Sequence, residues 1–293
     1  MSKSRVDFVI EESTEGRTLV VTGRWSREAE NAIVAGDADG LNLNYARGFC
    51  EGDLSFLGSW PVRRLDVLDR SIGSLEPIAR LARSLDHLSV QAAPDARLDL
   101  GVTPKLRYLA GEWPLLRPTL EAVSSSLCCL TTWKFDESNL LPLVEQSQLE
   151  NLTVKDAGRL ETLDGVSALS KLSVLGIHMA RGLTDISALR YPPPSLRELR
   201  FEYCSKLSRL DDLSTQTQLH HLGINDCRII ESLLPLRGLT ELEVFHAWGS
   251  THIADHDLSP LLQFSRLREV RLKSRKEYRP PVDTIKARLG QTQ

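Results

Sequence analysis

The sequence has too few cysteines, at too irregular a spacing, to build a disulfide framework. It contains five, an odd number, and Cys128 and Cys129 are adjacent, a position from which two thiols rarely bridge each other. No spacing matches the paired cysteines of a structural zinc site. We therefore expect free thiols and a reducing, cytosolic location.

Long apolar runs are also missing. None approaches the roughly 18 consecutive residues that a membrane helix needs. Residues 1–12 carry five charged side chains and no apolar segment of the kind that secretory signals contain. We expect no membrane span and no secretory signal. The net charge is only −3, so the chain as a whole does not favour nucleic acid as a partner.

The short motifs that mark common catalytic sites are absent as well. The sequence has no Gly-x-Gly-x-x-Gly, no Walker-type loop, no Gly-x-Ser-x-Gly and no His-Glu-x-x-His. These absences exclude the commonest dinucleotide-binding, phosphate-binding, serine-hydrolase and zinc-protease signatures. We predict a protein that is not an enzyme and carries no cofactor.

Leucine, by contrast, is in large excess and is periodic. Of 50 leucines, only three precede position 50. Eleven copies of the pattern Leu-x-x-Leu-x-Leu, with other aliphatic residues allowed at each leucine, occur at intervals of 20 to 28 residues, and three of them have Gly111, Thr132 or Phe201 at the last position. These copies start at Ala38, Val62, Leu85, Leu106, Leu127, Leu149, Leu172, Leu196, Leu219, Leu239 and Leu267. Self-similarity at this period indicates a solenoid, in which each repeat covers the core of the next.

Each copy is predicted to form a short strand. In the copy that starts at Leu149, Leu152 and Val154 alternate with polar residues and so point to one face. Such a strand is stable only when it stacks in parallel on its copies, which buries leucines that contribute about 1.5–3 kcal/mol each. The rest of each repeat returns through apolar segments such as residues 183–189, whose Asp and Ser favour a 3₁₀ or single helical turn.

The repeats resemble the leucine-rich-repeat family over residues 38–275, and the returning segment at 183–189 is similar to that of internalin-type bacterial repeats. The resemblance implies an α/β leucine-rich-repeat solenoid, shaped as an arc or horseshoe, with a parallel concave β-sheet and a convex side of short 3₁₀ turns and loops. It also implies a short bacterial, internalin-like protein without signal peptide or surface anchor. The chain departs from the family at the ninth motif position, usually Asn, Cys or Thr, where only Cys204 and Cys227 match.

The terminal repeats of a solenoid need caps, because they would otherwise expose the core. We predict an N-terminal cap with a β-hairpin and a short helix, then the repeats, then a C-terminal cap with a short helix. Their ranges are 1–37, 38–275 and 276–293. Within the N-terminal cap, we expect the hairpin at residues 6–23 and the helix from Ser26 to Val34. Two charged caps favour a monomer.

The concave face is the predicted binding surface. Motif positions 3, 5 and 7 project from the sheet there, and position 8 lies at its rim. Aromatic residues at positions 7 and 8 lie among charges of both signs, a composition typical of protein-binding hot spots. The predicted partner-binding residues are Trp113, Trp133, Lys134, Lys155, His178, Glu202, Tyr203, Phe245 and His246. The alternative is that some of these aromatic side chains only pack under their neighbours.

These features predict a non-catalytic scaffold that binds a protein partner, of which a neutralising, immunity-type inhibitor is a narrower form. Two alternatives stay open. His252 and His256, with Asp255 and Asp257 nearby, could hold a metal for a regulator or enzyme if they shared a helical face with a third ligand. The basic segment 266–279 could bind nucleic acid, although charge on the last strand of an open sheet also prevents edge-to-edge association.

Overall fold

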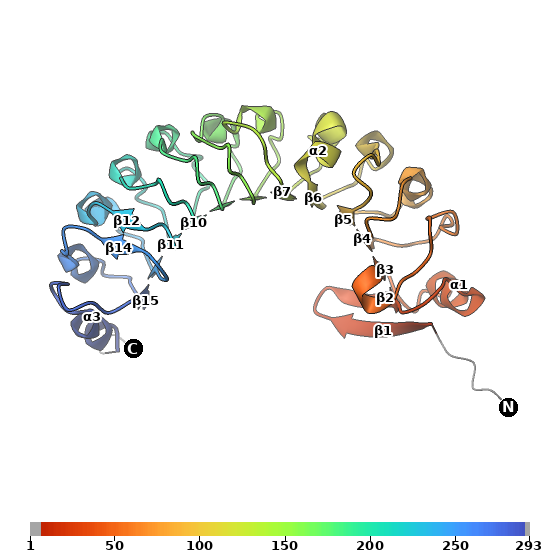
Figure 1. Cartoon of the computed structure of the whole chain (residues 1–293), viewed down its shortest axis with the longest axis horizontal. Coiled ribbons are helices and arrows are strands. Elements are labelled where there is room, and N and C mark those ends of the chain that lie inside the picture. The colour runs from red at the N-terminus through yellow and green to blue at the C-terminus, as the bar shows by residue number, and fades with distance from the viewer. Residues whose placement is uncertain (1–6, 291–293) are drawn as a thin grey trace. The chain divides into compact units, whose positions relative to one another are not determined.

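The computed structural model describes residues 7–290, so Val6 of the expected hairpin and residues 291–293 of the expected C-terminal cap lie outside it. Contacts divide the chain into two units, residues 1–130 and 131–293, and each is described by itself. In both units short parallel strands alternate with 3₁₀ turns, and Figure 1 shows the turns on the side away from the strands. This arrangement confirms the predicted leucine-rich-repeat fold. Between residues 7 and 290, no helix is long and apolar enough to cross a membrane.

The first unit begins with an antiparallel hairpin of β1 (Phe8–Ser13) and β2 (Gly16–Val21), followed by α1 (Arg27–Val34). Parallel pairs join β2 to β3 and continue to β6. These strands are β3 (Gly40–Asn44), β4 (Arg64–Leu68), β5 (His87–Gln91) and β6 (Tyr108–Glu112). Helix α2 (Trp113–Leu116) follows β6, and the 3₁₀ turns are η1 (Tyr45–Arg47), η2 (Glu76–Leu81), η3 (Leu100–Val102) and η4 (Arg117–Val123).

The boundary between the units falls within β7 (Cys129–Trp133). The sheet of the second unit pairs in parallel through β8 (Asn151–Val154), β9 (Val174–His178), β10 (Glu198–Glu202), β11 (His221–Asn225), β13 (Val244–Ala247) and β15 (Glu269–Leu272). A second parallel pair, β12 (Ile229–Ile230) and β14 (His252–Ile253), lies in the returning segments. The remaining elements are the 3₁₀ turns η5 (Leu141–Leu143), η6 (Val166–Ala168), η7 (Ser187–Arg190), η8 (Asp211–Leu213), η9 (Leu234–Gly238), η10 (Ser259–Leu262) and helix α3 (Val282–Gly290).

The core of the second unit is a stack of leucines from the same position of successive repeats. Leu152 pairs with Leu175, Leu175 with Leu199, and Leu199 with Leu222, and all four side chains are fully buried. Each leucine is covered by its equivalents in the neighbouring repeats, so the array provides the burial that one repeat cannot. The predicted alternation of core and solvent-facing residues is therefore confirmed for these strands.

One repeat has a different register from the predicted one. In β13, Phe245 pairs with Leu222, so the repeat is Leu242-x-x-Phe245-x-Ala247 and starts three residues after the predicted Leu239. Phe245 is fully buried, and Leu239 ends the preceding 3₁₀ turn instead. Both frames place a leucine at the first position, but only the observed one buries the Phe245 ring. It also makes the adjacent intervals 23 and 25 residues instead of 20 and 28.

The residue at motif position 8 has a left-handed backbone in consecutive repeats of the second unit. The φ angles are 55° at Lys134, 50° at Asp156, 56° at Met179, 56° at Tyr203, 53° at Asp226 and, in the corrected register, 71° at Gly249. The Tyr203 N–H donates to the Asn225 carbonyl oxygen at 3.0 Å. This bond adds one more backbone hydrogen bond between β10 and β11 at the point where the chain turns. Each such non-glycine residue costs on the order of 1–2 kcal/mol, which the repeated backbone bonds offset.

Two buried cysteines and a threonine bond the turning backbone where a longer asparagine ladder is missing. The thiols of Cys204 and Cys227 donate to the carbonyl oxygens of Ile177 and Phe201, both at 3.5 Å. Thr251 Oγ1 extends the series by donating to the Ile224 carbonyl oxygen at 2.5 Å. These three side chains therefore stabilise the strand ends of three successive repeats, the region that also carries the site described below.

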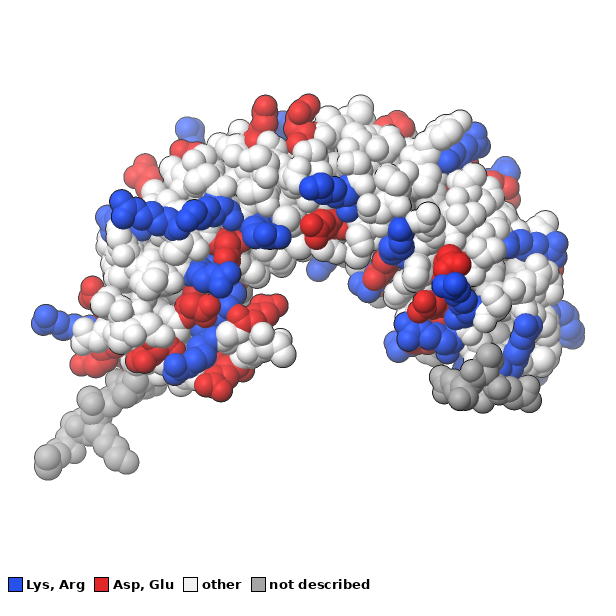
Figure 2. Space-filling model, turned by 180° about the vertical axis from the view of Figure 1, so that it is seen from behind, with Lys and Arg blue, Asp and Glu red and all other residues white. Residues whose placement is uncertain are grey.

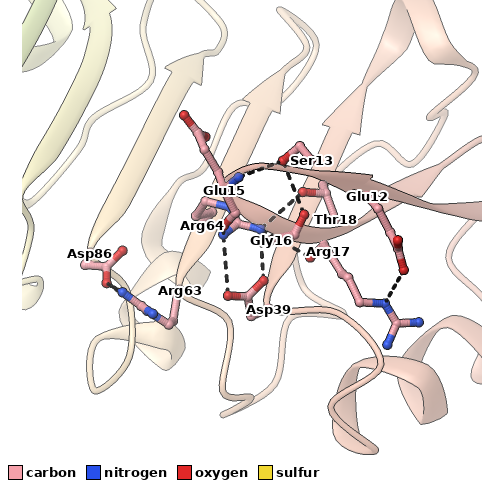
Figure 3. A network of polar contacts seen from close by, with 10 residues as sticks. All are labelled: Glu12, Ser13, Glu15, Gly16, Arg17, Thr18, Asp39, Arg63, Arg64 and Asp86. Carbon is pink, nitrogen blue, oxygen red and sulfur yellow. Dashed lines mark hydrogen bonds and ion pairs between the residues drawn. The ribbon is translucent and has the colours of Figure 1, made fainter.

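In the first unit, Arg64 connects the hairpin to the repeats (Figure 3). Its guanidinium donates to Asp39 (Nη2–Oδ1 2.9 Å) and to the backbone carbonyl oxygen of Glu15 in the hairpin turn. The Arg64 side chain is 14% exposed, whereas that of Arg63, which pairs with Asp86, is 61% exposed. A nearly buried cation thus satisfies a turn carbonyl and a carboxylate together, which fixes the hairpin on β4.

Candidate partner-binding surface

Two of the predicted aromatic residues do not reach solvent, and the prediction that places Trp113 at the rim of the concave face and Phe245 on it is wrong. Both side chains are fully buried. Phe245 fills a core position because of the register of β13. Trp113 is the first residue of α2, and Pro114 follows it, so the chain enters a helix directly after β6 instead of turning outward. Proline favours the first turn of a helix, and this signal was overlooked in the sequence.

The other predicted residues all lie in the second unit. Lys134 and Tyr203 are exposed, whereas Trp133, Lys155, His178, Glu202 and His246 are half-buried. In the paired strands, His178 lies opposite Glu202, and Glu202 lies opposite Asn225. We use the term open face for the surface of the second unit formed by motif positions 7 and 8 of β7 and by motif positions 3, 5, 7 and 8 of β8, β9, β10, β11, β13 and β15.

His178 and Glu202 form a hydrogen-bonded pair on the open face. The His178 Nδ1 lies 3.0 Å from the Glu202 Oε2. Burial lowers the pKa of His178, and the neighbouring Glu202 carboxylate opposes this effect. At neutral pH the imidazole is therefore uncharged and donates its Nδ1 hydrogen to the carboxylate, which leaves the negative charge of Glu202 available to a partner.

A second polar cluster occupies the neighbouring strands. His246 Nε2 lies 3.0 Å from Glu269 Oε1, and Arg271 Nε lies 2.7 Å from the same oxygen. The His221 and His246 rings meet edge to face at 5.0 Å between centroids. Burial, with Arg200 and His246 adding to it, lowers the pKa of His221 to about 4, and the hydrogen bond from His246 lowers the pKa of Glu269. The hydrogen bond, the ion pair and the ring contact together fix side chains from three neighbouring strands.

Sequence reasoning missed Trp248, an exposed tryptophan on this face. In the corrected register it occupies position 7, and it is 56% exposed, beside Tyr203 at 55%. Both aromatic residues line a hollow of about 570 Å³. Its walls consist of Glu202, Tyr203, Asn225, Asp226, His246, Trp248, Val270, Arg271, Leu272 and Lys286. The uneven repeat intervals around Leu239 were the signal that could have revealed Trp248.

The backbone that carries Trp248 is held by the preceding repeat. The Trp248 N–H donates to Asn225 Oδ1 at 2.9 Å, and the Asp226 N–H donates to the Trp248 carbonyl oxygen at 3.0 Å. Asp226 Oδ1 also accepts from the Ser250 N–H at 2.9 Å. Two neighbouring polar side chains therefore fix the turn, and the exposed indole is presented on an ordered backbone.

The basic segment does not form an unbroken positive stripe in the part of the chain that the structure describes. Three of its arginines have acidic partners: Arg266 with Glu241, Arg268 with Glu243 and Arg271 with Glu269. In Figure 2, basic and acidic side chains lie next to one another toward the C-terminal end of the chain. This pairing favours the interpretation of the segment as a protected edge strand.

The two histidines of the metal-binding alternative, His252 and His256, lie close together, but their acidic neighbour is not Asp255 or Asp257. The carboxylates of Asp255 and Asp257 bond backbone N–H groups two residues further along the chain. Glu277 takes their place beside His252 and His256. No helix contains this group, because His252 lies in β14.

Comparison with known proteins shows the fold alone. No family model and no curated protein matches the chain. An internalin of Listeria monocytogenes, InlF, is similar to it with 17% identity and a TM-score of 0.52, over 73% of this chain and 68% of that one. Internalin C2 of the same organism has 20% identity and a TM-score of 0.46, over 72% and 81%. A leucine-rich-repeat protein of Leptospira interrogans has 13% identity and a TM-score of 0.40, over 86% and 88%.

Proposed function

We propose that this leucine-rich-repeat chain is a non-catalytic scaffold that binds a protein partner on the open face of its second unit. The observation that carries the proposal is the pair of exposed aromatic residues, Tyr203 and Trp248, at one hollow. Tyrosine and tryptophan are the residue types that most often dominate protein interfaces. Grouped exposed aromatic side chains cost solvation free energy in the absence of a partner, so they need a reason that single ones do not.

The backbone around these two residues favours binding. The Tyr203 N–H donates to the Asn225 carbonyl oxygen, and the Asn225 side chain accepts from the Trp248 N–H. Binding therefore has to order only the side-chain rotamers and not the loops that present them. This preorganisation reduces the entropic cost that usually offsets most of the favourable contacts in an interface.

The charges around the hollow suggest how a partner is oriented. Glu202 and Asp226 contribute negative charge, whereas Arg271 and Lys286 contribute positive charge. Mixed charges at a rim add specificity and set the orientation of the complex more than they add affinity. The preferred partner surface is an apolar protrusion that is flanked by charges of both signs.

The proposed set of binding residues follows from these observations. It retains seven of the predicted residues, adds Trp248 and omits Trp113 and Phe245. Its members are Trp133, Lys134, Lys155, His178, Glu202, Tyr203, His246 and Trp248.

Affinity capture from host lysate tests the proposal with a matched control. The bait variant carries Tyr203→Ala and Trp248→Ala, and the control carries Tyr191→Ala, because Tyr191 is 80% exposed but lies directly after η7, away from the open face. We expect one protein to be retained by the wild type and the control and lost with the double variant. Retention of the same proteins by all three baits would contradict the proposal.

A further inference from the structure

Three potential metal ligands meet on the returning side of the second unit, outside the open face. His252 comes from β14, His256 from the turn after it, and Glu277 from the segment before α3. One ligand atom from each residue lies within 4.8 Å of the others. Two imidazoles and a carboxylate are a donor set that Zn²⁺ and similar transition-metal ions take.

Backbone hydrogen bonds hold the two segments of this cluster together. The Arg279 N–H donates to the His256 carbonyl oxygen at 2.9 Å, and the Leu258 N–H donates to the Arg279 carbonyl oxygen at 2.7 Å. His252 is fixed by the pairing of β14 with β12. The three side chains therefore converge before any ion is bound, which lowers the ordering cost of binding.

Tyr278 contacts the His252 ring through its hydroxyl group. Its side chain is fully buried, and its hydroxyl lies 3.3 Å from His252 Nδ1 and accepts from the Ile253 N–H at 3.1 Å. Metal-binding histidines commonly have a hydrogen-bond partner at the ring nitrogen that does not bind the ion, which fixes the ring orientation. Tyr278 is placed to fill this role for His252.

The donor chemistry of the cluster suits a divalent cation. The two imidazoles offer uncharged nitrogen ligands, and the Glu277 carboxylate adds the negative charge that they lack. Both histidines are half-buried and Glu277 is exposed, so an ion can enter from solvent and keep a water ligand.

We propose that His252, His256 and Glu277 form a binding site for a divalent transition-metal ion of the Zn²⁺ type. The ion links β14 and its turn, in the repeat that starts at Leu242, to the segment before α3. The site is independent of the proposed open-face function, because none of its ligands lines the hollow at Trp248.

The test is a Zn²⁺ titration of the full chain after removal of metal, in a Cys50→Ser background that removes the exposed thiol. We expect one equivalent to bind. His252→Ala and Glu277→Gln should each weaken the Zn²⁺ affinity by about 10-fold to 100-fold or more. Loss of a residue that only hydrogen-bonds to a metal ligand already has an effect of this size. The matched control is His220→Ala. His220 also lies beside a glutamate, with its Nδ1 3.3 Å from Glu243 Oε1, but it is not part of the proposed site. The Zn²⁺ affinity of this variant should equal that of the wild type.

A second readout separates the metal site from misfolding. Glu277→Gln changes an exposed side chain and should leave the melting temperature of the metal-free protein unaltered. Zn²⁺ at a concentration that saturates the wild type should raise the melting temperature of the wild type and of His220→Ala by more than that of Glu277→Gln, which binds the ion more weakly. Absence of Zn²⁺ binding by the wild type, or equal binding by wild type and Glu277→Gln, would overturn the proposal. Neither outcome would affect the capture experiment at the open face.

Discussion

Single residues at motif position 8 determine how the strands β7 to β11 and β13 end. Asp156, with φ at 50°, and Tyr203, with φ at 56°, have left-handed backbones, and this conformation turns the chain away from the sheet. Glycine adopts such a conformation at no steric cost, whereas β-branched residues strongly disfavour it. The choice of residue at this position therefore affects stability through the backbone as well as through the side chain.

Substitutions at Asp156 test this backbone requirement. We expect Asp156→Gly to leave the free energy of unfolding unchanged or to raise it by up to about 1 kcal/mol. Asp156→Val should lower it by about 1–2 kcal/mol, because the branched side chain clashes at positive φ. Urea denaturation measures both. Equal stabilities of the two variants would show that Asp156 does not adopt the left-handed conformation.

The register of β13 depends on Phe245 and leads to a prediction at the same scale. Phe245→Ala should lower the free energy of unfolding by about 3–5 kcal/mol, because it opens a cavity in a closed core. His246→Ala, which removes one hydrogen bond on the open face, should cost about 1 kcal/mol. Urea denaturation measures both. If the strand had the register that starts at Leu239, Phe245 would face solvent and its removal would cost no more than that of His246.

His221 predicts a loss of stability in acid. Its pKa in the folded chain is lowered to about 4, whereas a histidine in an unfolded chain titrates near about 6.5. Between these values the unfolded state binds more protons, so the free energy of unfolding falls as the pH drops from about 6.5 to 4, and it keeps its full value above that window. Urea midpoints between pH 4 and 8 should show this slope, and His221→Gln should reduce it. An identical slope in the variant would mean that His221 is not protected from protonation.

At the scale of elements, Arg64 reinforces the attachment of the hairpin β1–β2, which also pairs with β3 through its backbone. Arg64→Ala should lower the free energy of unfolding by about 1.5–3 kcal/mol, because it removes charged hydrogen bonds from a nearly buried site. Arg63→Ala, one residue away, removes an exposed ion pair and should cost about 1 kcal/mol or less. Denaturation curves of the two variants make the comparison, and equal losses would contradict the role of Arg64 (Figure 3).

The strands and their inward faces could be predicted from the sequence, because leucine spacing alone determines which side chains alternate into the core. Leu152, Leu175 and Leu199 occupy the inward-facing motif position that was expected for them. The pattern failed where it fits twice, since Leu239 and Leu242 both start an acceptable copy. Only the pairing with β11 separates them, and sequence periodicity carries no information about a partner strand.

The candidate sites could be predicted only in part. Tyr203 and His178 were found because their strands have regular register, whereas Trp248 was assigned to no surface because its strand does not. Glu277 lies 21 residues after His256 and shares no motif with it. Their meeting depends on how two loops fold back on each other, and local patterns cannot reveal such a contact.

At the scale of the whole molecule, the second unit carries both proposed sites. The hollow at Trp248 lies at the ends of the strands, whereas the His252 group lies in the returning segments. Zn²⁺ can therefore stabilise the C-terminal repeat without contacting the partner. The two proposals can fail independently, since the variants that test one leave the residues of the other intact.

The central claim is that the open face of the second unit holds a protein partner through Tyr203 and Trp248. The most direct measurement is the affinity of the captured partner for Trp248→Ala, beside Tyr191→Ala, by isothermal titration calorimetry. We predict that Trp248→Ala weakens binding by about 30-fold or more, the effect of a hot-spot residue, while its melting temperature stays that of the wild type. Unchanged affinity for Trp248→Ala, or an equal loss for Tyr191→Ala, would contradict the account.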